Sequence, residues 1–241
     1  MSVTMIEGRE DQRRKVLIAG GGVAGVEALL AFAALSPGRV SVELMAPEPD
    51  FVYRPLSVAE PFELAVVRRL PLAELAAEHD AHYRRDALVE VDPRRRVVTT
   101  RDGEELGYDS LLLAIGARAT VALPGALTFS GPPDVEAFAV LLGQLEQGAV
   151  KRVAFAVPHA VRWPLPIYEL ALMTAAHLAA RDVSGVAITV VTHEREPLDV
   201  FGRGTSERVR SLADAAGVEI VTSSAPASVG PDRLVLMNGA G

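Results

Sequence analysis

The 241-residue chain contains no cysteine. Disulfides, thiolate-bound metals, thiol nucleophiles and cysteine redox relays are therefore all excluded from the chemistry of this sequence. No segment offers the run of about 18 apolar residues that a membrane-spanning helix requires. Residues 1–15 are polar and charged and lack the apolar stretch of a signal peptide, so we expect a cytoplasmic protein with no transmembrane segment.

Positive charge is also scarce, since 24 basic residues face 31 acidic ones and the formal net charge is −7. This balance argues against nucleic acid or an anionic membrane as the main partner. The five histidines lack metal-ligand spacing, and no G-x-S-x-G elbow occurs, so we expect neither a zinc site nor a hydrolase triad. Apolar residues make up 49% of the chain, which is enough for a buried core.

A strand–helix–strand pattern occurs twice. In each case a short apolar run, typical of a strand buried on both faces, precedes a loop, an apolar helix and a second strand. Two such units predict an α/β fold class with two Rossmann-like βαβ domains, the alternative being a chance similarity of the two patterns. The expected strand, helix and strand are 16–20, 24–35 and 40–46 in the first unit, and 153–157, 165–180 and 186–192 in the second.

The region between the two units has a different character. Glycine and proline cluster at 125–133, where we place the domain boundary, giving domains 1–125 and 126–241. The further expected elements are two strands within 86–101 around an Asp92-Pro93 turn, a strand at 110–116, a helix at 134–147, and strands at 219–223 and 233–237 joined by a loop.

A glycine loop follows the first strand. Gly20, Gly22 and Gly25 form G-x-G-x-x-G between a buried strand and an apolar helix. In this motif the first glycine allows the tight turn, the second lets the backbone approach a pyrophosphate, and the third lets the helix pack closely. The helix N-terminus adds free N–H groups and a positive dipole end. The motif predicts dinucleotide binding; the alternative is a glycine-rich turn that binds nothing.

An acidic residue near the end of the second strand usually binds a ribose hydroxyl in such a site. Glu43 lies inside the expected strand, whereas Glu48 follows Pro47 in the loop beyond it. We prefer Glu48, because a ribose reaches the loop more readily than the strand. The alternative is a solvated loop glutamate.

Three motifs in order carry a family resemblance: the glycine loop, APEPDFVYRPLSVAEPF (46–62) and YDSLLLAIGAR (108–118). Together they resemble the FAD-dependent pyridine nucleotide-disulfide oxidoreductases, in the branch of sulfide:quinone reductases and type II NADH dehydrogenases. The resemblance implies that the domain 1–125 binds FAD and that the domain 126–241 is of the NAD(P)-binding kind. In that family a later segment returns to complete the FAD domain. None follows Asn238, so we expect a C-terminally truncated chain with an incomplete first domain.

The resemblance also assigns residues to the cofactor. Arg54 has an alternative interpretation as a surface arginine, and Ala114 and Gly116 as plain strand packing. The residues expected around FAD are Gly20, Gly22, Val23, Ala24 and Gly25 at the phosphates, Glu48 at the adenosine ribose, Arg54 and Pro55 beside the cofactor, Leu88 and Val89 at the adenine, and Ala114 and Gly116 beside the linker.

The second βαβ unit departs from the family, because the loop at 158–166 (PHAVRWPLP) has no glycine. Its three prolines and Trp163 hinder a close approach of the backbone to a pyrophosphate. Arg162 is available to a phosphate, and Glu169 lies on the expected first turn of the helix, as a glutamate does in the family's nicotinamide site. NAD(P)H therefore stays open as a second cofactor, beside a structural Rossmann-like domain with a rebuilt loop.

The resemblance implies an FAD-dependent oxidoreductase. Without cysteines, electrons would pass from NAD(P)H or another small donor to a quinone or small acceptor through the flavin alone. The alternative is a truncated or degenerate nucleotide-binding module without turnover. A homodimer stays open.

Overall fold

A computed structural model describes residues 13–117, 120–121, 123–158, 161, 163–230 and 232–238. The chain divides into two compact units. The first takes its described residues from Met1–Tyr53 and Arg68–Arg118, and the second from Arg54–Val67 and Ala119–Gly241. The segment Arg54–Val67, grouped by sequence with the first domain, thus belongs to the second unit, because its apolar Val58 and Phe62 are buried in that unit's core.

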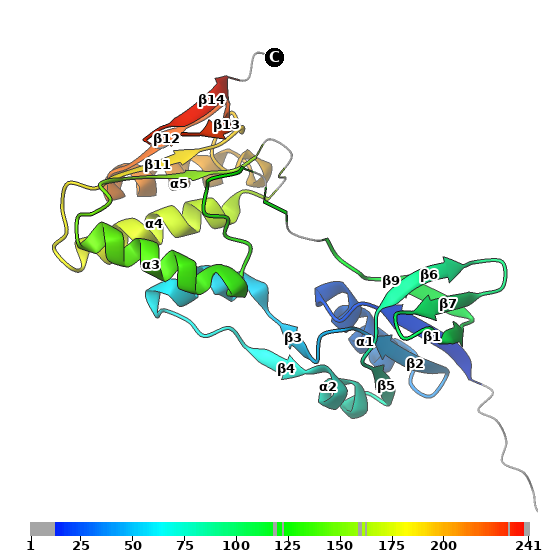
Figure 1. Cartoon of the computed structure of the whole chain (residues 1–241). Helices are drawn as coiled ribbons and strands as arrows, with labels where there is room; N and C mark the ends of the chain where they lie inside the picture. The colour runs from blue at the N-terminus through cyan, green and yellow to red at the C-terminus, as the bar shows by residue number, and fades with distance from the viewer. Residues whose placement is uncertain are drawn as a thin grey trace, which may run out of the picture. The chain divides into compact units, whose positions relative to one another are not determined.

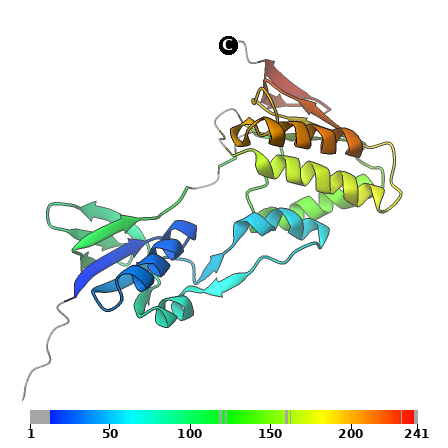
Figure 2. The same ribbon diagram turned by 180° about the vertical axis from the view of Figure 1, so that it is seen from behind.

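A four-stranded parallel sheet forms the centre of the first unit, in the order β5-β2-β1-β9. Helices α1 and α2 cover one face, and a three-stranded antiparallel sheet covers the other (Figures 1 and 2). The elements are β1 (Arg14–Ala19), α1 (Val23–Leu35), β2 (Val40–Met45), α2 (Leu72–Glu78), β5 (Ala81–Arg84) and β9 (Ser110–Leu113), with β6 (Leu88–Asp92), β7 (Val97–Thr100) and β8 (Glu105–Gly107) in the covering sheet.

Strand β1 is buried on both faces, which accounts for its continuous apolar run. Val16 and Ile18 pack against the helices, while Leu17 and Ala19 point to the other face and pack under β6 and β7. Successive side chains of a strand alternate between faces, so a strand covered on both sides needs an apolar residue at every position. A short ribbon of β3 (Asp50–Val52) and β4 (Arg69–Pro71) completes the unit.

The second unit contains a three-stranded parallel sheet in the order β10-β11-β12. One apolar core gathers side chains from this sheet, from three helices and from the 3-10 segment η1. The elements are η1 (Arg54–Phe62), η2 (Pro132–Asp134), α3 (Val135–Glu146), β10 (Arg152–Ala156), α4 (Leu165–Ala179), β11 (Ala187–Val191), η3 (Asp199–Phe201), α5 (Arg203–Ala216) and β12 (Val218–Val221), followed by the hairpin of β13 (Ser224–Val229) and β14 (Leu234–Asn238).

The α/β fold class with two βαβ units is confirmed, since β1-α1-β2 and β10-α4-β11 lie where the sequence predicts them. Sequence reasoning missed two helices, α2 and α5, the 3-10 segments η1, η2 and η3, and the strands β3, β4, β5, β8 and β13. Helix α5 shows why: only Ser206 and Ala213 are buried on it and most of its residues are polar, so the sequence has no apolar run there. Among the described residues no helix combines the length and the apolar character needed to cross a membrane.

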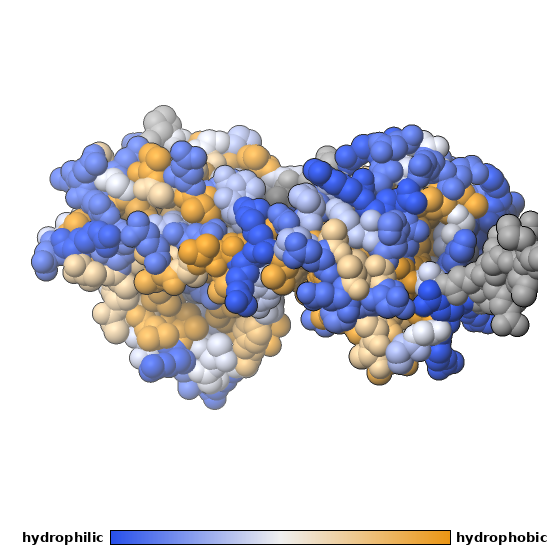
Figure 3. Space-filling model, turned by 90° about the horizontal axis from the view of Figure 1, so that it is seen from below, coloured by the Kyte–Doolittle hydropathy of each residue, from blue (hydrophilic) through white to orange (hydrophobic). Residues whose placement is uncertain are grey.

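The surfaces of both units are mixed. In the space-filling view, patches of hydrophobic residues lie among hydrophilic ones (Figure 3). In the first unit several exposed aliphatic residues lie near the carboxyl ends of β1 and β9, among them Val23 at the start of α1, Leu113 at the end of β9 and Ile115 just after it. These positions adjoin the glycine loop.

Candidate functional site

The three glycines of the motif differ in whether the fold itself requires a glycine at that position. Gly20 has a φ of +120°, and a Cβ on it would lie 2.1 Å from the Ala114 carbonyl oxygen. A Cβ on Gly25 would lie 1.8 Å from the Gly20 carbonyl oxygen. A Cβ on Gly22 would meet no atom within 4 Å. The fold therefore requires glycine at positions 20 and 25, whereas position 22 faces open space in which a ligand backbone or phosphate can approach.

Gly21 is a fourth glycine with a steric reason, which sequence reasoning missed. A Cβ there would lie 2.4 Å from Leu72 Cδ1 and 2.9 Å from the Ala46 Cβ. The glycine loop, the loop after β2 and the start of α2 therefore pack together. Only knowledge of α2, an element that the sequence did not reveal, could have indicated this contact.

The N-terminus of α1 is free to receive an anion. Its N-cap residue is Gly22, which makes no side-chain capping bond, and its first intrahelical bond runs from the Val26 N–H to the Gly22 carbonyl at 3.0 Å. The N–H groups of Val23, Ala24 and Gly25 precede that bond. Because such groups and the helix dipole favour negative charge, this end of α1 fits a phosphate.

Ala114 and Gly116 lie at the end of β9, beside the glycine loop. The Ala114 N–H donates to the Ala19 carbonyl at 2.8 Å, which continues the pairing of β9 with β1. Gly116 has a φ of +64° and open space around it, and Ile115 between them is 68% exposed. The structure thus brings Gly20, Ala114 and their neighbours together at the carboxyl ends of two adjacent strands, the edge at which parallel sheets bind ligands.

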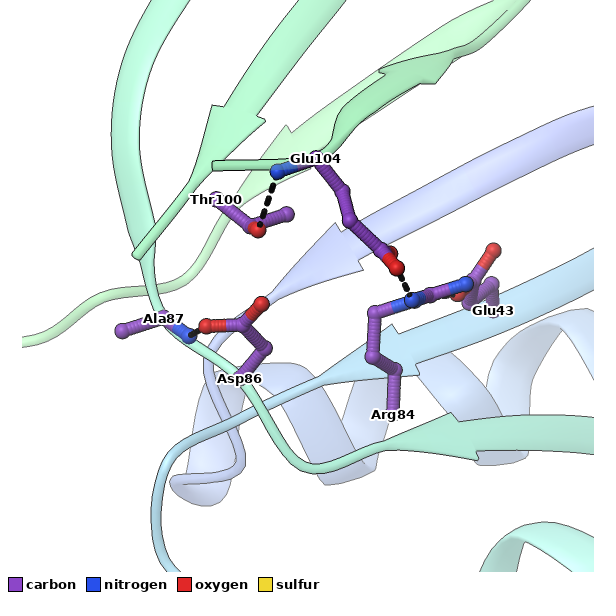
Figure 4. A network of polar contacts seen from close by, with 6 residues as sticks. All are labelled: Glu43, Arg84, Asp86, Ala87, Thr100 and Glu104. Carbon is purple, nitrogen blue, oxygen red and sulfur yellow. Dashed lines mark hydrogen bonds and ion pairs between the residues drawn. The ribbon is translucent and has the colours of Figure 1, made fainter. Parts of the chain in front are cut away.

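The two candidate acids differ in their bonding. Glu43 Oε1 accepts a bond from Arg84 Nε at 2.5 Å, and a second Arg84 nitrogen bonds Glu104 at 2.5 Å (Figure 4). The carboxylate of Glu48 is exposed and makes no hydrogen bond or ion pair with any other described residue. Glu43 is thereby committed to joining β2 to β5, and Glu48 remains the acid available to a ribose.

Leu88 and Val89 open strand β6. Leu88 pairs with Thr100 and Glu90 with Thr99, so Val89 is the extra residue of a β-bulge and is 66% exposed. Bulges release backbone groups from the ladder and are frequent next to binding sites. The bulge leaves the backbone at Val89 available to an adenine.

Asp86 holds the start of β6 in place. Its Oδ1 accepts the Ala87 N–H at 2.6 Å (Figure 4). The Thr100 hydroxyl, followed by the backbone N–H of Ala87, keeps the pKa of Asp86 below its ordinary value. An ionised carboxylate therefore ties the end of β5 to the β6–β7 hairpin.

Arg54 and Pro55 are placed with the other unit. They begin η1, where the Ser57 hydroxyl donates to the Arg54 carbonyl at 2.6 Å, and both are exposed. The structure groups them with the core of α3 and α4 rather than with the glycine loop.

The second βαβ unit offers a poorer N-terminus. Helix α4 has Pro164 as its N-cap and Pro166 in its first turn, and the Ile167 N–H already donates to the Pro164 carbonyl at 3.1 Å. Prolines have no N–H, so only Leu165 keeps a free donor in this turn. The exposed Trp163 packs edge-to-face on Phe201 at 5.2 Å between ring centroids.

The predicted second-site residues are Arg162 and Glu169. Arg162 lies outside the described residues. Glu169 is the fifth residue of α4, so it lies on the second turn and the prediction of the first turn was wrong by one residue. Burial raises the pKa of the Glu169 carboxyl above its ordinary value.

Glu194 follows β11, at the place where a nucleotide-binding unit carries its ribose acid. It is buried, and its Oε2 accepts bonds from the Tyr168 hydroxyl at 2.7 Å and the Thr192 hydroxyl at 2.9 Å. Burial, followed by the bond to Glu194, raises the pKa of Tyr168. This acid is therefore used within the core.

No other described cluster competes with the glycine loop. No group of three or more metal-ligating side chains occurs among the residues that the structure describes. An open hollow of about 470 Å³ lies by Lys15 and Asp109, at the amino ends of β1 and β9, and is lined further by Arg13, Arg95 and Arg96. It is thus at the opposite end of the sheet from the glycine loop.

Comparisons with known proteins agree with this arrangement. The chain is 25% identical over 232 residues to a sulfide-quinone reductase of Aquifex aeolicus, covering 92% of this chain and 54% of the relative. The crystal structure of the sulfide:quinone oxidoreductase from Aquifex aeolicus superposes with a TM-score of 0.84 at 22% identity, over 93% of this chain and 54% of that one. The structure of NDH2 from Plasmodium falciparum in complex with NADH superposes with a TM-score of 0.75 at 14% identity, over 95% of this chain and 52% of that one.

The chain thus spans about half the length of these relatives. The family described as pyridine nucleotide-disulphide oxidoreductase matches residues 14–153, which is more than half of the chain and includes the glycine loop, the Glu48 loop and β9. The chain belongs to the pyridine nucleotide-disulphide oxidoreductase family.

Proposed function

We propose that the first unit binds FAD across the glycine loop and that the protein is a flavin-dependent oxidoreductase. The observation that carries this proposal is Gly22, an exposed glycine that the fold does not need, at an uncapped helix N-terminus. The residues proposed to hold the cofactor are Gly20, Gly22, Val23, Ala24 and Gly25 at the pyrophosphate, Glu48 at the ribose, Leu88 and Val89 at the adenine, and Ala114 and Gly116 toward the flavin.

Bound FAD would supply hydride and electron transfer, and the protein would orient it. This chain contributes no thiol, so no step through a protein sulfur is available to it. The names of the relatives support a quinone or another small molecule as the acceptor. Arg54 and Pro55, which open η1 in the other unit, belong to this proposal only through the resemblance.

The donor is the finer part of the proposal. A solved relative carries NADH. In this chain, however, Pro164 caps the start of α4 and Pro166 lies in its first turn. The Glu194 carboxylate already accepts a hydrogen bond from the Tyr168 hydroxyl. We infer that the described residues of the second unit bind NAD(P)H weakly at most, and that another small donor reduces the flavin.

A nucleotide-binding module without turnover is the second candidate, favoured by the same proline loop. FAD-loaded protein, mixed with a reduced donor and a soluble quinone, distinguishes the two. Turnover of the quinone supports the oxidoreductase, and binding of FAD without any turnover, across a panel of donors, supports the module.

The exchange of Gly22 for alanine tests FAD binding. Gly22 has a φ of −80°, so Gly22→Ala requires no strained backbone, and its Cβ enters only empty space. We expect unchanged folding and an affinity for FAD weakened about five-fold or more, because a steric cost of roughly 1–3 kcal/mol falls on the complex alone. Flavin fluorescence quenching measures it.

Gly107→Ala is the matched control, since a Cβ there also meets nothing within 4 Å. It should bind FAD like the wild type. Equal affinity of the Gly22→Ala and wild-type proteins would contradict the proposed site.

A further inference from the structure

Tyr83 fastens the loop that carries Glu48 to strand β5. It lies on β5, next to β2, and its hydroxyl lies 2.7 Å from the Glu48 carbonyl oxygen and 3.2 Å from the Ala46 carbonyl oxygen. The hydroxyl has one proton, which the two carbonyls share. Both acceptors belong to the loop after β2 that carries Glu48.

The same loop is fastened at its far end. The Leu72 N–H donates to the Pro49 carbonyl at 2.9 Å, and Pro47 and Pro49 restrict the backbone between the two attachments. Glu48 therefore has a fixed backbone and an exposed, unbonded carboxylate among the described residues. A loop whose backbone is held in this way receives a ligand at reduced entropic cost.

Of these attachments, Tyr83 makes its bonds through a side chain, whereas Leu72 uses its backbone N–H. Burial raises the pKa of the Tyr83 phenol, so it stays protonated and able to donate throughout the neutral range. The ring packs against the apolar core of the first unit, where Tyr83 is the register partner of Leu44, so the hydroxyl can be removed while the ring keeps its place.

We propose that Tyr83 is a positioning residue that sets the preference of this site for an adenine dinucleotide over a flavin mononucleotide. It acts by holding the Glu48 backbone so that the carboxylate accepts the ribose hydroxyls of the adenosine half. This rests on the proposed function. A mononucleotide flavin lacks that ribose, so its binding does not use Glu48 or Tyr83.

Tyr83→Phe removes the hydroxyl and keeps the ring. We expect the affinity of the whole chain for FAD and for ADP to fall about five-fold each, the effect of one neutral hydrogen bond. Binding of FMN should stay within about two-fold of the wild-type value, a difference of about 0.4 kcal/mol. Tyr108→Phe is the matched control, because Tyr108 is a half-buried tyrosine of the same unit whose hydroxyl makes no hydrogen bond with another described residue. It should bind all three ligands like the wild type.

A double-mutant cycle with Glu48→Ala tests the route of the effect. If Tyr83 acts through Glu48, the loss caused by Tyr83→Phe disappears in the Glu48→Ala background. A Tyr83→Phe protein with wild-type affinity for FAD overturns the inference, as does a loss that persists in that background or that weakens FMN equally. A wild-type chain that binds neither FAD nor ADP overturns the proposed function and this inference with it.

Discussion

The two βαβ units have the same order of elements, but they differ in the backbone N–H groups and the acid that each offers to a ligand. Around α1, the residues Gly22, Val23 and Ala24 are exposed and carry N–H groups, and Glu48 offers a free carboxylate. Around α4, Pro164 and Pro166 carry none, and the carboxylate of Glu194 is bonded inside the core. We therefore propose that the loop and one acid, rather than the Rossmann-like topology, make a nucleotide site.

The largest expected difference between the units concerns glycine packing. Gly25→Ala places a Cβ 1.8 Å from the Gly20 carbonyl oxygen, so the helix must move. We expect the free energy of unfolding to fall by about 3 kcal/mol, at the upper end for overpacking. Urea unfolding measures it.

The matching change in the second unit is Gly143→Ala, in the interior of α3 with nothing within 4 Å. It should raise the free energy of unfolding by about 0.5–1 kcal/mol, the usual gain of alanine over glycine in a helix. A Gly25→Ala protein as stable as the wild type would show that α1 does not pack closely on its strand.

The second-largest expected effect on stability concerns Glu194, the buried acid of the second unit. Tyr168→Phe leaves the buried Glu194 carboxylate with one bond fewer, and we expect a loss of about 1–3 kcal/mol in the free energy of unfolding. Tyr83→Phe, whose shorter bond goes to the carbonyl of the exposed Glu48 and to no buried charge, should lose less. If both variants were equally stable, Glu194 would not be a structural acid, and the contrast between the two units would weaken.

The smallest effect concerns acid stability in the first unit. The pKa of Asp86 is lowered in the folded state, mainly by the Thr100 hydroxyl. Its ionised form therefore stabilises the fold above the ordinary aspartate pKa of about 3.9, and this contribution is lost as the pH falls through the lower folded value.

Asp86→Asn should remove that contribution, so unfolding of the variant should depend less steeply on pH below about 4 than unfolding of the wild type. Acid titration followed by circular dichroism measures the slope. Asp182→Asn, an exposed isosteric change in the other unit, should leave the slope unchanged. A wild-type slope in the Asp86→Asn protein would refute the role of Asp86.

Much of the fold follows from the sequence because its signals are local. The apolar runs at β1 and β10 and the helices after them are periodic over short windows, and the glycine loop has a fixed spacing. Helix α5, with few apolar side chains, and η1, a segment with two internal prolines, have no such signal.

The site was predictable only where a motif carries it. Glu48 could be preferred over Glu43 from its loop position, but the reason that Glu43 is unavailable, its bond to Arg84, depends on the pairing of β2 with β5. The contacts of Gly21 with Leu72 and of Tyr83 with the Glu48 loop join residues more than 30 positions apart. No local pattern encodes them.

One calorimetric titration tests the contrast between the units most directly. The chain is titrated first with FAD and then, once loaded, with NADH. The account predicts one FAD bound per chain and no heat from NADH beyond dilution. Absence of FAD binding, or one NADH bound to the FAD-loaded chain, would contradict it.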